Sequence, residues 1–172
     1  MDIKLVVPTL ALKDKALEYR KEHFDFHEYV INGSEMFDKM DTYEEWLSRI
    51  TRNKNLDTVD SNWVVTDTFF AVRKSDEKII GIIDFRHELN DFLKPFGNSG
   101  YSVRPSERRK GYATEMLRLL LLHAKKSGYK EIYLSVEKEN KPSHQTILKN
   151  GGTLEKTFMF EGEEIYRYKV EL

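Results

Sequence analysis

The sequence contains no cysteine. Disulfide bonds, cysteine-ligated zinc and a cysteine acyl-enzyme are therefore excluded. A lack of disulfides is compatible with the reducing cytosol. Residues 1–12 carry Asp2 and Lys4 where a signal peptide has a basic segment and a long apolar one, so none is visible. No apolar run reaches the ~18 residues of a membrane span. We expect a cytoplasmic protein that does not enter a membrane.

An excess of charge of either sign is also lacking. The chain has 28 basic and 29 acidic residues, for a formal net charge of −1. Binding to nucleic acid generally needs a basic surface, so we expect no nucleic-acid partner. Proline and glycine are sparse, at 4 and 9 residues, while 40% of the chain is hydrophobic. A chain of 172 residues with this composition is expected to fold as one domain, residues 1–172.

The hydrophobic patterns predict a mixed α/β domain with a mostly antiparallel central sheet. The predicted order is a strand, two helices, three strands, a helix, a strand, a helix and two strands, which makes about seven strands and four helices. The strongest helical pattern begins near residue 112. Its apolar face consists of Ala113, Met116, Leu117, Leu120, Leu121 and Ala124.

The stretch that carries chemical information runs from Tyr101 to Thr114 and reads YSVRPSERRKGYAT. A predicted strand ends at Pro105, a basic loop follows, and the small residues Gly111 and Ala113 stand where the long helix begins. The first N–H groups of a helix have no internal partners, and the helix dipole adds positive charge there. This combination predicts a site for a phosphate or pyrophosphate.

Other phosphate-binding and nucleophile motifs are missing. The chain has no G-x-x-x-x-G-K-[ST] loop, no G-x-G-x-x-G after its first strand and no G-x-S-x-G elbow. A basic loop before an ordinary helix is the plain alternative. The succession of strand, proline, basic residues and small residues favours the anion site.

The run Arg108-Arg109-Lys110-Gly111-Tyr112-Ala113 matches the [Q/R]-x-x-G-x-[G/A] signature of the GNAT superfamily of N-acetyltransferases. The segment from Asn140 to Gly151 resembles the next element of that family, in which an asparagine opens a short helix leading to a glycine. The segments 86–90 and 100–105 are similar to a group of predicted GNAT acetyltransferases without an assigned substrate. Before residue 60, only the order of a strand and two helices agrees with the family.

The resemblance implies an enzyme that moves an acetyl group from acetyl-CoA directly to an amine in a ternary complex, with no metal. The backbone of Val103 would pair with the pantetheine arm, and Asn140 and Ser143 would lie beside that arm and the thioester. Arg108 would begin the loop, and the side chain of Arg109 or Lys110 would reach the phosphates. The pyrophosphate would be held by N–H groups of Arg109, Lys110, Gly111, Tyr112, Ala113 and Thr114.

Two positions depart from the family pattern. Many GNAT enzymes have a tyrosine seven residues after the asparagine as a general acid, and this chain has Ile147 there. Some have a glutamate about eleven residues before the signature, and this chain has Gly97. The general base is therefore open. Glu88 and His87 are the leading candidates, and the alternatives are Asp84, Asp91, His144, or water with positioning alone.

The acceptor is expected to be a small molecule with an amino group, which the sequence does not identify. A non-catalytic acyl-CoA sensor is the alternative function, since the usual tyrosine and glutamate are missing, and an interaction domain with a degenerate site is a third.

An exposed edge strand in the C-terminal hairpin could support a homodimer. The aromatic residues Tyr101, Trp63, Phe69, Phe70 and Trp46 are expected to be packing residues, as is His123.

Overall fold

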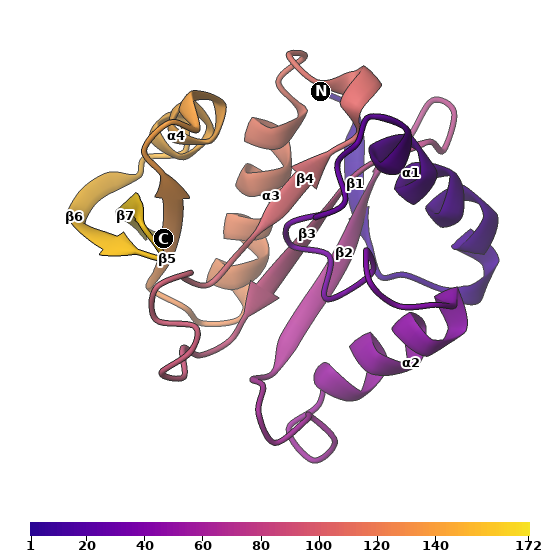
Figure 1. Cartoon of the computed structure of the whole chain (residues 1–172), viewed down its shortest axis with the longest axis horizontal. Coiled ribbons are helices and arrows are strands. Elements are labelled where there is room, and N and C mark those ends of the chain that lie inside the picture. Colours follow the sequence, from indigo (N-terminus) through magenta and orange to yellow (C-terminus); the bar gives the residue numbers. More distant parts are fainter.

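The computed structural model describes all residues from 1 to 172 (Figure 1). Its helices are α1 (Lys13–Asp25), α2 (Tyr43–Asn53), α3 (Tyr112–Lys126) and α4 (Lys141–Lys149). Its strands are β1 (Ile3–Val6), β2 (Thr66–Arg73), β3 (Ile79–Arg86), β4 (Tyr101–Val103), β5 (Glu131–Glu137), β6 (Thr153–Phe160) and β7 (Glu163–Glu171). The seven strands, the four helices and their order confirm the fold predicted from the hydrophobic patterns.

The strands form two antiparallel sheets, in the orders β1-β2-β3-β4 and β5-β7-β6. The sheets meet at one bridge between Gly97 and Leu134, beside which the Asn98 N–H donates to the Tyr133 carbonyl over 2.7 Å. Gly97 has φ +81°, and a Cβ there would lie 2.5 Å from the Tyr133 carbonyl oxygen. Position 97 thus needs glycine for the sheets to join. Beyond this junction β4 and β5 separate.

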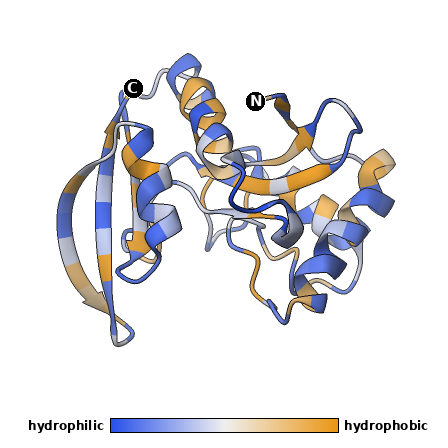
Figure 2. Ribbon diagram, turned by 90° about the horizontal axis from the view of Figure 1, so that it is seen from above, coloured by the Kyte–Doolittle hydropathy of each residue, from blue (hydrophilic) through white to orange (hydrophobic).

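Helices cover the first sheet on both faces (Figure 2). On one face α1 and α2 bury a cluster around Trp46, Phe37 and Phe70. Thr42 begins α2 with a capping box, because its hydroxyl accepts from the Glu45 N–H and the Glu45 carboxylate accepts from the Thr42 N–H. On the other face the apolar side of α3 joins residues of β3, β5 and β7 in a second core. This shared core holds the two sheets in their splayed arrangement.

The C-terminal sheet ends in a hairpin between β6 and β7. Glu161 and Gly162 have φ values of 49° and 83°, the left-handed conformation that a two-residue hairpin turn requires. Strand β6 is an edge strand with mostly exposed side chains. Phe160 at the hairpin tip packs against Phe96, with ring centroids 5.2 Å apart, so the tip lies against the loop that follows β3. None of the helices combines the length and apolar character needed to cross a lipid bilayer.

Candidate active site

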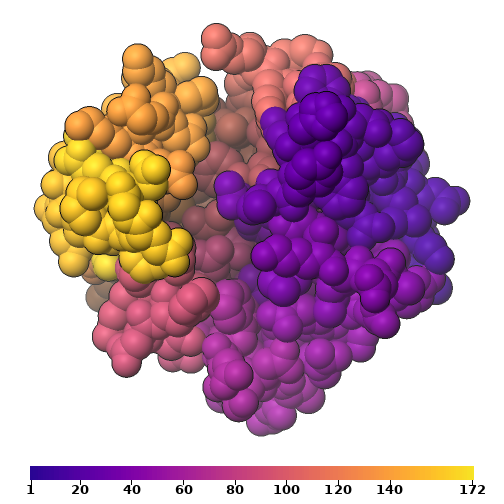
Figure 3. All heavy atoms as spheres, viewed as in Figure 1, coloured from indigo at the N-terminus to yellow at the C-terminus, as the bar shows by residue number.

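A cleft with a volume of about 1110 Å³ opens between the two sheets (Figure 3). It is lined by β4 and the loops on either side of it, the start of α3, β5, α4 and the tip of the β6–β7 hairpin. Nine of the ten residues predicted to contact coenzyme A line it, namely Val103, Arg108, Arg109, Gly111, Tyr112, Ala113, Thr114, Asn140 and Ser143. The exception is Lys110. Segments distant in sequence are therefore brought to one cavity.

The loop before α3 presents free backbone donors to one end of this cleft. None of the six N–H groups from Arg109 to Thr114 donates a hydrogen bond within the protein, and Gly111 provides no side-chain cap. Arg109 and Gly111 are both left-handed, with φ values of 64° and 84°. Backbone of this kind turns successive N–H groups toward one concavity, which is a site for an anion. The helix dipole of α3 adds positive potential at the same point.

Arg108 fixes the loop to the rest of the protein. Its guanidinium makes a bidentate pair with Glu28, at 2.6 Å for each bond, and its Nε donates to the Val103 carbonyl over 3.1 Å. The two bonds from Arg108 are the main reason that the pKa of Glu28 falls to about 2. Glu28 also contacts the buried His23. Arg108 thus holds the loop in place, and its guanidinium is already bonded to Glu28 and the Val103 carbonyl.

The next two basic side chains differ in what surrounds them. Lys110 donates to Glu107 over 2.8 Å, and Glu107 is nearly buried and also pairs with Arg73 and Lys78. These bonds, with that from Lys110 first, lower the pKa of Glu107 to about 2. Arg109 has no side-chain partner and lines the cleft. Of the two, Arg109 is the side chain available to a phosphate.

Strand β4 offers an open edge to the cleft. The Asp84 N–H donates to the Gly100 carbonyl over 3.1 Å, and the Arg104 N–H donates to the Ile80 carbonyl over 2.7 Å. Because alternate residues of an antiparallel strand bond to one neighbour, Tyr101 and Val103 direct their N–H and C=O groups away from β3. No strand covers this side of β4. An extended ligand can therefore pair with β4 as an added strand, as the resemblance implies for pantetheine.

Buried charged groups support the floor of the cleft. Asp84 is fully buried, accepts from the Gly100 N–H over 2.6 Å and pairs with Arg86 over 3.0 Å. Arg86 lines the cleft and also donates to the Gly97 carbonyl. Glu35 lies close by, and its burial, followed by the charge of Asp84, raises its pKa well above the usual range. These contacts tie β3 to the start of β4 and to the junction of the sheets.

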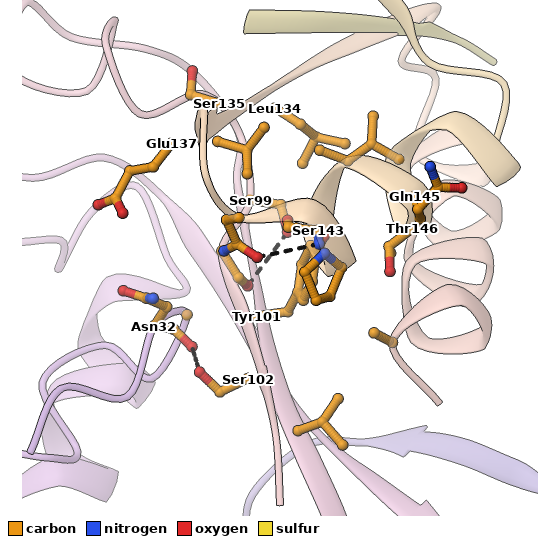
Figure 4. Close-up of a pocket in the computed structure, with 18 of the residues that line it drawn as sticks. Asn32, Ser99, Tyr101, Ser102, Leu134, Ser135, Glu137, Ser143, Gln145 and Thr146 are labelled. Atoms are coloured by element: carbon orange, nitrogen blue, oxygen red, sulfur yellow. Dashed lines mark hydrogen bonds between the residues drawn. The ribbon is translucent and has the colours of Figure 1, made fainter. Parts of the chain in front are cut away.

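Helix α4 faces β4 across the middle of the cleft. The Asn140 side chain caps this helix by accepting from the Ser143 N–H over 3.3 Å. The Ser143 hydroxyl and the Tyr101 phenol are 2.7 Å apart, and Figure 4 shows them meeting between the two elements. Ile147 is buried two turns from the start of α4. The prediction that Tyr101 is a packing residue is incomplete, because its ring contacts the core while its hydroxyl lies at the cleft.

The side of the cleft formed by the end of β5 and the hairpin tip carries acidic side chains. Glu137, at the end of β5, and Glu161 and Glu163, at the hairpin tip, line it without any ion-pair partner. Their neighbour Glu164 is instead paired with Lys138 over 2.8 Å. The docking of the hairpin tip on Phe96 places Glu161 and Glu163. The acidic residues were visible in the sequence, but nothing local indicated which of them would face the cleft.

The candidate bases named from the sequence lie outside the cleft lining. His87 contacts Asp67 through Nε2 over 2.8 Å, and Glu88 is exposed. His144 uses both ring nitrogens, on the Tyr168 hydroxyl and on backbone carbonyls. The other candidates are Asp84, which is fully buried, and Asp91, which is exposed and paired with Lys94. None of the five histidines lines the cleft. His123 shares Asp67 with His87 and packs against Phe69, in agreement with its predicted packing role.

Solved structures share this fold. A microcin self-immunity acetyltransferase, MccE, in complex with acetyl-CoA and AMP superposes with a TM-score of 0.70 at 20% identity, over 99% of this chain and 93% of that one. RimL, an alpha-N-acetyltransferase of a ribosomal protein, in complex with coenzyme A gives 0.70 at 14% identity, over 100% and 95%. A GNAT-family acetyltransferase from Bacillus anthracis gives 0.66 at 18% identity, over 99% and 95%. No curated protein matches the sequence.

The family assignment comes from the sequence itself. Residues 5–153 match the model of the acetyltransferase (GNAT) domain. That match contains the loop before α3, the open edge of β4 and the asparagine that caps α4. The chain therefore belongs to the GNAT family of acyl-CoA-dependent acetyltransferases.

Proposed function

We propose that this protein is an N-acetyltransferase that moves the acetyl group of acetyl-CoA directly to an amine in a ternary complex. The observation that carries the donor half of the proposal is the run of six free N–H groups from Arg109 to Thr114, placed at one end of the open β4 edge. A pyrophosphate on the free N–H groups directs the pantetheine arm along Val103 toward Tyr101. The thioester then lies in the middle of the cleft, beside Asn140 and Ser143.

The amine acceptor enters from the acidic end. A lysine-like amine has a pKa of ~10.4 and is an ammonium ion at neutral pH. The unpaired carboxylates of Glu137, Glu161 and Glu163 attract such an ion. RimL, which shares the fold, is an alpha-N-acetyltransferase, and its acceptor is an amine. We infer that an amine of a cationic small molecule is the substrate class.

The amine must lose a proton before it attacks the thioester carbonyl. Because no histidine lines the cleft, a carboxylate of the acidic end or an ordered water is the base that this geometry favours. His87 and Glu88 stay untested predictions, and their positions outside the lining do not support a direct role. The open N–H groups of β4 would stabilise the oxyanion of the tetrahedral intermediate.

We further propose that residues 1–172 act as one domain in the cytoplasm. The β6 edge is the surface through which we propose that a homodimer forms.

A substitution at Ala113 tests the donor site without disturbing the helix. Ala113 is the second residue of α3, where an acidic side chain favours the helix dipole. In Ala113→Asp, the carboxylate occupies the cradle and repels the pyrophosphate, whereas Ala113→Asn adds nearly the same volume without charge. We expect titration calorimetry to show acetyl-CoA binding that Ala113→Asp weakens by about 100-fold and Ala113→Asn by much less.

Turnover separates the proposed enzyme from a sensor. The wild type is mixed with acetyl-CoA and a panel of polyamines, amino acids and peptides with free N-termini, and released thiol is measured. Binding with amine-dependent thiol release supports the enzyme. Binding without release from any amine favours the non-catalytic acyl-CoA sensor. Failure of the wild type to bind acetyl-CoA, or equal binding by Ala113→Asp, would overturn the donor site.

A further inference from the structure

The loop between α1 and α2 forms one wall of the cleft, and we define the wall loop as residues 31–38. Asn32 and Gly33 of this loop line the cleft. In Figure 3 the N-terminal segments, in indigo and purple, border the cleft opposite the yellow C-terminal hairpin. The Asn32 carbonyl accepts from the Ser102 hydroxyl over 2.9 Å (Figure 4). Gly33 has φ +73°, and a Cβ there would clash with the Gly100 carbonyl. The wall loop therefore rests directly on the backbone at the start of β4.

Glu35 lies two residues further along the wall loop and is buried inside the protein. Its residue is only 7% exposed, and its Oε2 atom is buried without a hydrogen-bond partner. The backbone is left-handed at Glu35 and at Met36, with φ values of 52° and 73°, which is costly for residues that carry a side chain. An ionised carboxylate without hydrogen bonds is very unfavourable in such a place. The closed wall loop therefore favours the neutral acid form of Glu35.

The charged groups around Glu35 lead to the same conclusion. They are Asp84 and Arg86 of β3 and Arg49 of α2. Arg86 already pairs with Asp84 over 3.0 Å, and Arg49 already pairs with Asp60 over 3.1 Å. Ionised Glu35 would therefore be an uncompensated negative charge beside Asp84. Its burial, followed by the charge of Asp84, raises the pKa of Glu35, so the carboxyl keeps its proton at neutral pH.

We propose that the protonated carboxyl of Glu35 is a latch that keeps the wall loop against β4, and that release of its proton to solvent accompanies the opening of this wall of the cleft. The latch sets the width of the cleft on the side opposite the hairpin, and its consequence for the amine acceptor rests on the proposed function. Opening also relieves the left-handed backbone at Glu35 and Met36.

The latch predicts how opening depends on pH. In the open loop Glu35 lies in water, where a glutamate has a pKa of ~4.3. Above that pH the open form has lost a proton that the closed form keeps. The equilibrium constant for opening therefore rises by about 10-fold per pH unit, until the pH reaches the raised pKa of the closed form and the constant levels off. The wall loop is thus held most tightly in mild acid.

Hydrogen exchange of two backbone amides in the full chain measures this opening. The Ile31 N–H donates to the Asp38 carboxylate over 2.9 Å. The Phe37 N–H donates to the Ser34 carbonyl over 3.1 Å. Protection factors, which are corrected for the intrinsic exchange rate at each pH, report the free energy of opening. Both amides should be less protected than those of the buried face of α3. Equal protection would mean that the loop opens only when the whole fold does, and would overturn the latch.

The decisive comparison uses two glutamate substitutions. Glu35→Gln keeps the size of the side chain and cannot lose a proton. Glu77→Gln is the matched control, because Glu77 is also left-handed, with φ 54°, but is exposed between β2 and β3. From pH 5 to pH 7, the protection factors of the wall loop should fall by about 100-fold in the wild type and in Glu77→Gln, and by less than about 3-fold in Glu35→Gln.

Two results would overturn the latch. One is a wild type whose wall loop shows no fall in protection over this range, a measurement that needs no variant to fold. The other is an undiminished fall in Glu35→Gln, which would assign the proton to another group, such as His23 or His27 just before the loop. Exchange requires neither acetyl-CoA nor an amine. A wild type that shows the fall but no turnover would therefore overturn the proposed function and support the latch.

Discussion

The two ends of the cleft present different kinds of chemical group to a ligand. The proposed donor end offers main-chain groups, namely the N–H groups from Arg109 to Thr114 and the open edge of β4. The proposed acceptor end offers side chains that come from the end of β5 and from the hairpin tip, namely Glu137, Glu161 and Glu163. A main-chain site needs only the right turn and small residues, so many sequences can form it. A side-chain site changes its specificity with each substitution.

This difference explains how the family can keep one cosubstrate while its acceptors vary. The donor loop is fixed by Arg108, which binds Glu28 and the Val103 carbonyl, and by the nearly buried Glu107. The acceptor end depends on where a hairpin tip docks against Phe96. Three predictions probe the contrast, starting with the donor end, where the largest effect is expected.

At the donor end, Arg109→Ala should weaken acetyl-CoA binding by about 10-fold, the loss of one charge-assisted hydrogen bond. Lys110→Ala is the matched control, because Lys110 is already bound to Glu107 and does not line the cleft. Calorimetry at low and high salt should show a loss of less than about 3-fold for Lys110→Ala, with less salt dependence than for Arg109→Ala. Equal losses for both variants would mean that general positive charge, rather than Arg109, holds the phosphates.

At the acceptor end, Glu163→Gln should raise the KM for a cationic amine by about 3-fold, since an exposed charge pair contributes little. The Kd for acetyl-CoA should not change. Glu164→Gln is the control on the next residue, because Glu164 is paired with Lys138 and does not line the cleft. Steady-state kinetics with one cationic and one neutral amine measure both effects. An equal change in KM for the two amines would contradict an electrostatic role for the acidic end.

Outside both ends, the smallest effects are expected. His87→Gln leaves an amide donor near Asp67, and Glu88→Gln removes an exposed charge. Because neither residue lines the cleft, kcat should stay within about 2-fold of the wild type in both variants, which is far below the 100-fold or more expected for loss of a general base. Steady-state turnover measures this. A 100-fold loss in either variant, with the melting temperature unchanged, would restore that residue as a catalytic candidate.

The sequence predicted most of the fold because its signals are local. Thr42 caps α2, the apolar period of α3 is continuous, and the pair Glu161-Gly162 makes a tight turn. The separation of the predicted central sheet into two was not predicted. It depends on a single close approach of Gly97 to Tyr133, between segments more than 30 residues apart. No local pattern marks the residue at which two strands part.

The same distinction holds for the site. By itself, the sequence determined the form of the loop before α3, because a glycine with positive φ, a proline stop and a helix start lie within a few residues of one another. These local features support the proposed anion site. Only the tertiary structure decided which carboxylates face the cleft, that His87 and Glu88 lie outside its lining, and that Tyr101 meets Ser143 from the opposite wall. These side chains come from distant segments of the chain. Packing of the hairpin and of α4 against the two sheets decides where they lie.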